Sequence, residues 1–323
     1  MRLKSEDRDE FLADVATLYY IQRLNQEEIA ARLSISRSNV SKLLQEAQKR
    51  RIVQFRIVHR LPQDDELQDA LISRFHLQSA FVLRGEHVRP DLLTMRVGEL
   101  AARQLETLLH GKTALAVTWG TALRAVADAL SPLPGLGIDV VQMIGSAGAH
   151  LPEVDGIELA RLFALLLGGR FWYLPAPLVV DDPALAEALR QHESVRPGLE
   201  RAARAELALV GIGALVSGVS SLQRAGYLDE CGIARLQQQG AVGDICGWHF
   251  DITGRILEID INKRIIALEP GLLKRIPAVM AVAAGKVKAP AILGALRTGA
   301  IHVLVTDSET GREVLRLDEE TST

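Results

Sequence analysis

The stretch NQEEIAARLSISRSNVSKLLQEAQKR, residues 25–50, predicts two short helices joined by a tight turn. Asn25 is suited to cap a first helix over 26–33, and Ser36 a second helix over 37–50. Short polar side chains at these positions accept hydrogen bonds from the free N–H groups of a first helical turn. Only three residues separate the two helices, which leaves room for a turn and nothing longer.

Apolar residues mark the buried faces of these two helices and of a third helix before them. They recur at the three- and four-residue spacing of one helix face. They are Leu12, Val15, Ala16 and Tyr19 in the preceding helix, then Ile29, Ala30 and Leu33, then Val40, Leu43, Leu44 and Ala47. This arrangement is a helix-turn-helix with a third helix packed behind it. The alternation of Val53, Phe55 and Ile57 with polar residues adds a short strand or wing.

The solvent side of the helix over 37–50 carries hydrogen-bonding side chains and no acid in its first half. These are Arg37, Ser38, Asn39, Ser41 and Lys42. In a helix-turn-helix, the second helix enters the major groove N-terminus first, where Arg binds guanine and Asn binds adenine. Ser41 and Lys42 are suited to phosphates. The alternative is a solvated three-helix bundle with a basic face, but helix lengths, turn length and charge placement together favour DNA binding.

The charge distribution also separates the two ends of the 323-residue chain. The net charge is −3, yet residues 1–60 carry 12 Lys and Arg against 8 Asp and Glu, and residues 61–323 carry 25 against 32. A basic N-terminal part on an acidic remainder indicates that only the former meets a polyanion. We expect a DNA-binding domain over 1–60 and a second domain over 61–323, with 61–65 as a linker.

Several classes of protein are disfavoured by the composition. Two cysteines, Cys231 and Cys246, cannot form a disulfide framework, and no His or Cys spacing suits a metal. The first ten residues are too charged for a signal peptide. The uncharged stretch 207–223 is short for a membrane span and diluted by Gly and Ser. We therefore expect a cytoplasmic protein with no metal and no membrane partner.

The remainder of the chain alternates apolar runs with helical patterns, which is typical of a mostly parallel α/β sheet. Strands are predicted at 80–83, 113–118, 139–144, 170–174, 207–212, 279–284 and 301–306. Helices are predicted at 66–75, 92–109, 157–167, 183–191, 289–296 and 310–317. About 260 residues suffice to bury such a core as one domain.

Ligands of open parallel sheets bind at the carboxyl ends of strands, and polar residues follow several of the predicted strands. Gly120 and Thr121 follow one strand and open a helix, which suits a phosphate. Lys286 and Lys288 follow another strand at a helix N-terminus, against the dipole preference, which favours an anionic ligand. Asp244 follows a glycine turn and is suited to sugar hydroxyls, and Arg264 to an anion. A conformational role for the Gly-Thr turn, and structural salt bridges for Asp244 and Arg264, stay open.

Both parts of the chain resemble the SorC family of bacterial sugar-responsive transcription regulators. In the first part the resemblance rests on Gln26–Ala30, Leu33, Ile35–Arg37, Asn39–Leu44, Ala47 and Ile52–Val53. In the second it rests on Trp119–Thr121, Gly211–Gly213, Gly240–Ile245, Phe250–Asp251, Arg264–Ile266, Ile276–Pro277, Ala284–Gly285, Lys288–Ala289, Ala291–Ile292, Ala295–Leu296 and Leu304–Asp307. The resemblance implies a second domain similar in fold to sugar-phosphate isomerases, which binds phosphorylated sugars without converting them, and a tetramer.

Carried over residue by residue, the resemblance implies that Gly120 and Thr121 cradle a phosphate, Asp244 holds the sugar, and Lys288 meets the phosphate or the carbonyl end. Two residues depart from the family pattern. Ala122 stands where the family often has a second threonine, and Lys286 where it often has a second glycine. Both departures fall in the expected pocket, so the effector can differ from the family's best-known ligands.

The sequence thus predicts a DNA-binding regulator whose affinity for a double-stranded operator is controlled by a phosphorylated sugar or polyol. No cofactor is expected, since Gly211-Ile212-Gly213 lacks the third glycine of a dinucleotide site. No catalytic residues are expected, because the motifs of Asp244 and Lys288 are not joined by a clear second catalytic carboxylate. At least a dimer is expected, because operators usually contain paired half-sites. Two alternatives remain open. One is a sugar-phosphate isomerase-like enzyme with a regulatory DNA-binding head, and the other is a DNA-binding protein whose second domain only oligomerises.

Overall fold

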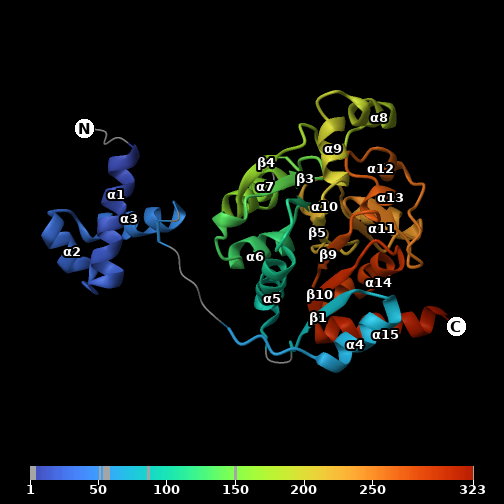
Figure 1. Ribbon diagram of the computed structural model, residues 1–323, viewed down its shortest axis with the longest axis horizontal. Helices are drawn as coiled ribbons and strands as arrows, with labels where there is room; N and C mark the ends of the chain where they lie inside the picture. The colour runs from blue at the N-terminus through green and yellow to red at the C-terminus, as the bar shows by residue number, and fades with distance from the viewer. Residues whose placement is uncertain (1–4, 51, 54–58, 86–87, 149–150, 323) are drawn as a thin grey trace. The chain divides into compact units, whose positions relative to one another are not determined.

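The computed structural model describes residues 5–50, 52–53, 59–85, 88–148 and 151–322, and the chain divides into two compact units at residue 60 (Figure 1). The first unit consists of α1 (Ser5–Ala16), α2 (Gln26–Leu33) and α3 (Arg37–Lys49). A π-helical segment, Thr17–Ile21, extends α1. The predicted helix-turn-helix is confirmed, with α2 over the expected residues and α3 ending one residue early.

Both predicted caps form in the first unit. The Asn25 side-chain oxygen accepts hydrogen bonds from the backbone N–H groups of Glu27 (2.9 Å) and Glu28 (3.0 Å), and the Glu28 carboxylate accepts one from Asn25 N–H (2.8 Å). The Ser36 hydroxyl accepts from the backbone N–H of Asn39 at 3.3 Å. The contacts of Asn25 and Glu28 are reciprocal and that of Ser36 is one-way, and both caps satisfy free donors of a first turn and fix where the helix begins.

Two details of the first unit differ from expectation or fall outside what is described. Leu18 is buried and Tyr19 only partly so, because the π-helical segment shifts the face that the chain presents to the core. The expected wing falls largely on residues 54–58, which lie outside the described residues.

A seven-stranded parallel sheet forms the centre of the second unit, in the order β1-β10-β9-β5-β2-β3-β4. All seven predicted strands are confirmed: β1 (Ser79–Leu83), β2 (Ala114–Val117), β3 (Ile138–Gln142), β4 (Gly168–Trp172), β5 (Leu207–Gly211), β9 (Ala278–Val282) and β10 (Val303–Asp307). The uncharged stretch 207–223 begins with β5, a strand of the parallel sheet, and continues into the segment that follows this strand. No helix within the described residues has both the length and the apolarity to cross a membrane.

Helices cover both faces of this sheet, as Figure 1 shows for α5, α6 and α7 on one side and α4, α14 and α15 on the other. Their bounds are α4 (Asp65–Phe75), α5 (Leu93–Leu108), α6 (Thr121–Ala129), α7 (Gly156–Leu167), α8 (Pro183–Gln191), α9 (Arg196–Ala203), α10 (Ser221–Arg224), α11 (Glu230–Gln238), α12 (Asp260–Lys263), α13 (Pro270–Leu273), α14 (Ala289–Arg297) and α15 (Ser308–Ser322). Short 3-10 turns include Pro152–Val154 and Lys286–Lys288. Each face of the sheet packs its own apolar core.

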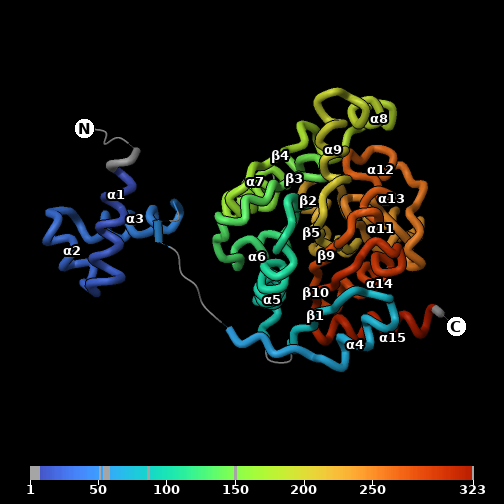
Figure 2. The backbone as a smooth tube through the Cα atoms, in the orientation of Figure 1, coloured from blue at the N-terminus to red at the C-terminus, as the bar shows by residue number. Residues whose placement is uncertain are grey.

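The first and last helices of the second unit lie beside each other, as the tube in Figure 2 traces. Asp318 on α15 is almost fully buried and pairs with Arg74 on α4 and with Arg297 on α14. The predicted linker is part of this unit rather than a free connection, because Gln63 forms a β-bridge with Leu83 and Asp64 caps α4.

A small antiparallel sheet was not predicted. It consists of β6 (Gly213–Ala214), β7 (Gly243–Ile245) and β8 (Trp248–Phe250). Strands of two or three residues are too short to show an alternating pattern, so the sequence gives no period to read. This sheet matters because it carries Asp244.

The order of strands locates the place where a ligand can bind. From β2 the chain adds β3 and β4 on one side, then crosses back to place β5 on the other side of β2, followed outward by β9 and β10. The loops that leave the carboxyl ends of β2 and β5 therefore diverge. In open α/β sheets, ligands bind in the crevice at such a reversal of strand order.

Candidate functional site

A small pocket opens at this reversal of strand order. It is lined by residues from the loops after β2 and β5, from the small sheet, from α10 and from the turn before α14: Thr118, Trp119, Gly120, Thr121, Ala122, Gly211, Ile212, Gly213, Ser221, Asp244, Cys246 and Lys288. The structure thus brings together four residues from separate parts of the sequence, Gly120, Thr121, Asp244 and Lys288, that the sequence singled out.

Gly120 turns the chain from β2 into α6 with φ of +115°, a conformation that side chains rarely adopt. No side chain caps α6, so the N–H groups of its first turn are available to a ligand. Thr121 adds a hydroxyl at the first helical position. Backbone N–H groups and the helix dipole make this end of the pocket suited to a phosphate.

Lys288 supplies a cation at the pocket and is largely buried. Its Nζ donates a hydrogen bond to the carbonyl oxygen of Ile212 at 3.2 Å. Burial lowers the pKa of Lys288, the negative charge of Asp244 raises it, and the positive charge of Arg224 lowers it further. An ammonium held by one carbonyl in this setting is stabilised by any anion that enters the pocket.

Asp244 lies on β7, directly opposite Gly213 on β6 and His249 on β8. One carboxylate oxygen, Oδ2, accepts a hydrogen bond from the Gly247 N–H at 3.2 Å. Burial raises the pKa of Asp244, while His249 and Lys288 act in the opposite direction. The carboxylate is an acceptor suited to ligand hydroxyl groups.

Arg264 and Lys286, the other predicted pocket cations, do not line the pocket. The Arg264 guanidinium pairs with Asp260 one helical turn earlier (2.8 Å) and donates to the Val180 carbonyl (3.2 Å). Lys286 is exposed and pairs with Glu313 at 3.7 Å. For Arg264 the structure therefore favours the salt bridge that the sequence had left open.

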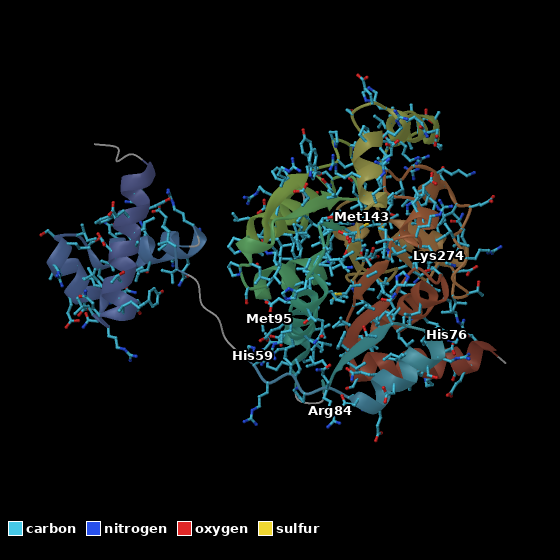
Figure 3. All side chains as sticks on the ribbon, viewed as in Figure 1. His59, His76, Arg84, Met95, Met143 and Lys274 are labelled. Atoms are coloured by element: carbon cyan, nitrogen blue, oxygen red, sulfur yellow. The ribbon has the colours of Figure 1, made fainter. Side chains whose placement is uncertain are left out.

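Several pocket residues were not found from the sequence. Thr118 directly follows β2, and its hydroxyl accepts a hydrogen bond from the Gly211 N–H at 3.4 Å, which ties the two diverging loops together. Ser221 begins α10. Cys246 is a buried residue of the pocket wall, and its thiol contacts the sulfur of Met143, labelled in Figure 3, at 3.7 Å. The position of Thr118 after an apolar run was a usable signal, whereas nothing near Ser221 marked it.

The predicted DNA-contacting residues lie on the first half of α3. Arg37, Ser38, Asn39 and Lys42 are exposed, and Ser41 is partly buried. Arg37 pairs loosely with Glu27 (3.7 Å), and both side chains are more than two-thirds exposed, so this pair adds little to stability. The Ser38 hydroxyl lies 2.9 Å from that of Ser36. Most of this half-helix is thus free of contacts that would compete with a nucleic acid.

Within the described ranges, no group of three or more His, Cys, Asp or Glu side chains is placed to hold a metal ion.

A helix-turn-helix unit joined to an α/β unit with a polar pocket at its strand ends is the plan of a ligand-responsive transcription regulator. The sequence model of a sugar-binding domain family (Sugar-bind) matches residues 59–316, and that of sigma-70 region 4 matches residues 13–50. The chain belongs to the SorC family of sugar-responsive transcription regulators.

Named relatives agree with this assignment. The transcriptional regulator LsrR of Klebsiella pneumoniae is 32% identical over 96% of this chain and 94% of its own. The deoxyribonucleoside regulator of Bacillus subtilis is 30% identical over 96% and 98%. Among solved structures, the full-length sorbitol operon regulator SorC of Klebsiella pneumoniae shares the fold, with a TM-score of 0.73, 24% identity and coverage of 97% of this chain and 100% of that one. A sugar-binding domain of a transcriptional repressor from Vibrio fischeri has a TM-score of 0.68 at 30% identity, covering 79% and 100%.

Replacing Gly213 with Ala tests the packing that positions Asp244. A Cβ atom at residue 213 would lie 2.0 Å from Asp244 Oδ1, so we expect the carboxylate to move out toward the pocket and its pKa to fall toward its ordinary value as it regains water. A carboxyl ¹³C NMR titration of wild type and Gly213→Ala measures this. Gly135→Ala is the matched control, because a Cβ there meets open space. An unchanged Asp244 titration in Gly213→Ala would contradict the assigned packing.

Proposed function

We propose that this protein binds operator DNA through α3 and that a phosphorylated sugar or polyol in the pocket of the second unit controls that binding. The single observation that carries the proposal is the pocket at the strand-order reversal. There an uncapped helix N-terminus and the largely buried Lys288 share a small cavity with the carboxylate of Asp244. An anion is stabilised by the first two groups, and hydroxyl groups by the third.

The chemistry of the lining favours a small phosphorylated ligand over an uncharged one. If the ligand were a neutral sugar, it would bring no negative charge to Lys288, and Asp244 would remain the anionic group that acts on this lysine. The names of two relatives support a sugar or polyol as the ligand class, since one is a deoxyribonucleoside regulator and another a sorbitol operon regulator, whereas the phosphate is inferred from the pocket alone. Ala122, at the second position of α6, gives this pocket a methyl group beside the expected phosphate site.

Operator recognition is proposed for Arg37 and Asn39, with Ser38, Ser41 and Lys42 as further contacts. The support is their position on the first half of α3, which is the part of a helix-turn-helix that enters the major groove. Control by the effector requires that it bind one arrangement of the DNA-binding units better than another, since equal affinity does not shift the equilibrium between the arrangements.

Because bacterial operators lie in the cytoplasm, we place the protein there.

We propose a sensor rather than an enzyme. The relatives named above are transcription regulators. Of the described residues that line the pocket, Asp244 is the single carboxylate, whereas proton abstraction and return on a sugar phosphate call for a positioned acid and base. Incubation with a panel of aldose and ketose phosphates tests the point, and catalytic turnover would favour the isomerase-like alternative.

We also propose that the protein acts as a homo-oligomer, and specifically as a tetramer as the family resemblance implies. An apolar patch supports the association of copies. It consists of Leu165 on α7, Phe171 on the edge strand β4, and Tyr173 just after it, which are 63%, 40% and 54% exposed. The rings of Phe171 and Tyr173 lie 6.4 Å apart. Exposed apolar side chains gathered on a sheet edge are typical of a protein interface.

Substituting Arg37 or Asn39 with Ala tests base recognition. Loss of a base contact should cost about 1–3 kcal/mol on the operator and little on random DNA, so sequence preference is relaxed. Lys42→Ala is the matched variant, because loss of a phosphate contact weakens both DNAs alike. Binding is measured by fluorescence anisotropy on operator and scrambled duplexes at one salt concentration. Equal weakening of both duplexes by Arg37→Ala would show that Arg37 reads no base.

A thermal-shift panel of phosphorylated and unphosphorylated sugars and polyols tests the pocket and names the effector. We expect stabilisation by a phosphorylated compound and its loss in Lys288→Met and Thr121→Ala, with operator binding kept. Lys286→Met is the matched control, because Lys286 is two residues away yet pairs with Glu313 outside the pocket. No responding phosphate would favour a second unit that only oligomerises. Retained stabilisation in Lys288→Met would overturn the pocket assignment.

Replacing Leu165 with Glu tests the apolar patch. A charge at an interface core is desolvated without a partner, so the oligomer should dissociate to a smaller species. Light scattering coupled to size-exclusion chromatography measures the mass. Leu185→Glu is the control, since Leu185 on α8 is similarly exposed (47%) and lies outside the patch. Unchanged mass in Leu165→Glu would assign the interface elsewhere.

A further inference from the structure

His249 is a buried histidine directly behind the pocket. It lies on β8 opposite Asp244 on β7, and residues paired in this way point to the same face of a sheet. Its side chain has no exposure to solvent, and its Nε2 atom has no hydrogen-bond partner among the described residues. A buried nitrogen of this kind calls for an explanation, because it has given up water without compensation.

The hydrogen bonds around His249 fix its tautomer. The Asn262 side-chain nitrogen donates to the carbonyl oxygens of His249 (2.9 Å) and Leu257 (2.8 Å), so the Asn262 oxygen must be the acceptor. That oxygen accepts from the His249 backbone N–H (2.9 Å) and lies 3.1 Å from His249 Nδ1. Nδ1 therefore carries a proton, and in the neutral ring Nε2 is an unpaired acceptor.

The charged groups around His249 come from several elements. Asp244 on β7 acts on it directly, and Lys288 acts on Asp244 from the turn before α14. The Cys246 thiol is neutral, because burial and Asp244 raise its pKa. On α12, Asp260 is exposed and paired with Arg264. Burial lowers the pKa of His249, and Asp244 opposes this effect.

We propose that Asp244 and His249 form a proton-accepting pair, so that filling the pocket with a sugar phosphate draws a proton from solvent onto this pair. The inference rests on the proposed function of the pocket. His249 has no solvent left to lose when a ligand enters, whereas Asp244 is still partly exposed. A ligand that covers Asp244 removes the water that screens its charge and adds negative charge nearby, and both changes favour a proton on the pair.

The added proton has two acceptors, the Asp244 carboxylate and His249 Nε2, and because these groups interact through their charges its uptake belongs to the pair rather than to either residue. His249 is a positioning residue in this scheme, because it acts on the ligand through Asp244. The sign of the linkage follows. Binding takes up a proton, so sugar-phosphate affinity falls as pH rises, by at most about tenfold per pH unit.

The experiment is calorimetry of the full-length protein between pH 7 and 8.5, where a sugar phosphate stays close to its dianion. The probe is the phosphorylated compound that gives the largest shift in the thermal panel. Titrations in buffers of different ionisation enthalpy count the protons taken up. We expect the wild type to take up about half a proton or more above the His249→Gln variant, with a steeper loss of affinity toward pH 8.5.

His302→Gln is the matched control. Burial also lowers the pKa of His302, but this residue precedes β10 at the amino end of the sheet, away from the pocket, and bonds the Val279 N–H. We expect wild-type proton uptake in this variant. Lys288 is present in the wild type and in both variants, so its protons contribute to all three measurements alike. The difference in proton uptake between the wild type and His249→Gln therefore reports on His249.

Imidazole ¹⁵N NMR of the ligand-free wild type gives a reading that needs no variant. We expect His249 as the neutral Nδ1–H tautomer, converted to a protonated ring or to a proton-sharing Nε2 on addition of the probe. Equal proton uptake in wild type and His249→Gln, or an Nε2 resonance that the probe leaves unchanged, would overturn the inference while leaving the pocket in place. Failure of every phosphorylated compound to bind would instead overturn the proposed function, and the inference with it.

Discussion

The parallel pairing of β2 with β5 is the constraint on which the second unit depends. Leu115, Ala116 and Val117 pair with Leu207, Ala208 and Leu209, and these residues are fully buried. The chain has already placed β3 and β4 on the other side of β2 when it returns to form this pair. The loops after β2 and β5 consequently leave in opposite directions, and the crevice between them is the pocket. Its location follows from connectivity and not from any one polar residue.

The charges inside the pocket are costly in the empty protein. Lys288 is largely buried with a single carbonyl as its hydrogen-bond partner, and the partly exposed Asp244 lies against Gly213 with one backbone N–H as its donor. A structural ion pair would have its atoms in contact, as Asp318 does with Arg74 and Arg297. The looser setting of Lys288 and Asp244 is the arrangement of groups whose partners arrive with a ligand, and perturbed side chains in a cleft commonly mark function.

The main sheet and the DNA-binding unit could be predicted from the sequence, because their apolar residues recur with the regular patterns of strands and helices. Six buried strands, the edge strand β4 and three amphipathic helices are each long enough to show a pattern in the sequence. The small sheet was missed, since β6 has two residues and β7 and β8 have three each. The pairing of Asp244 with His249 was therefore not predicted either, because it depends on a strand register that no local sequence pattern encodes. The π-helical segment at Thr17–Ile21 was not predicted for a similar reason. Its effect is that the buried position moves by one residue, from Tyr19 to Leu18.

Arg264 and Lys288 show how far such reasoning extends to single site residues. Both are cations in motifs that the family resemblance covers, yet one pairs on its own helical turn and the other faces the pocket. Asp260 stands four residues before Arg264, the spacing at which opposite charges meet on a helix, so the local partner was visible in the sequence. Lys288 has no acidic residue within four positions on either side. Lys286 sets the limit of that criterion, because its partner Glu313 is distant in sequence and only the packing of α15 brings it near. A cation without a local acid is therefore a candidate for ligand binding, and the fold decides which candidates remain.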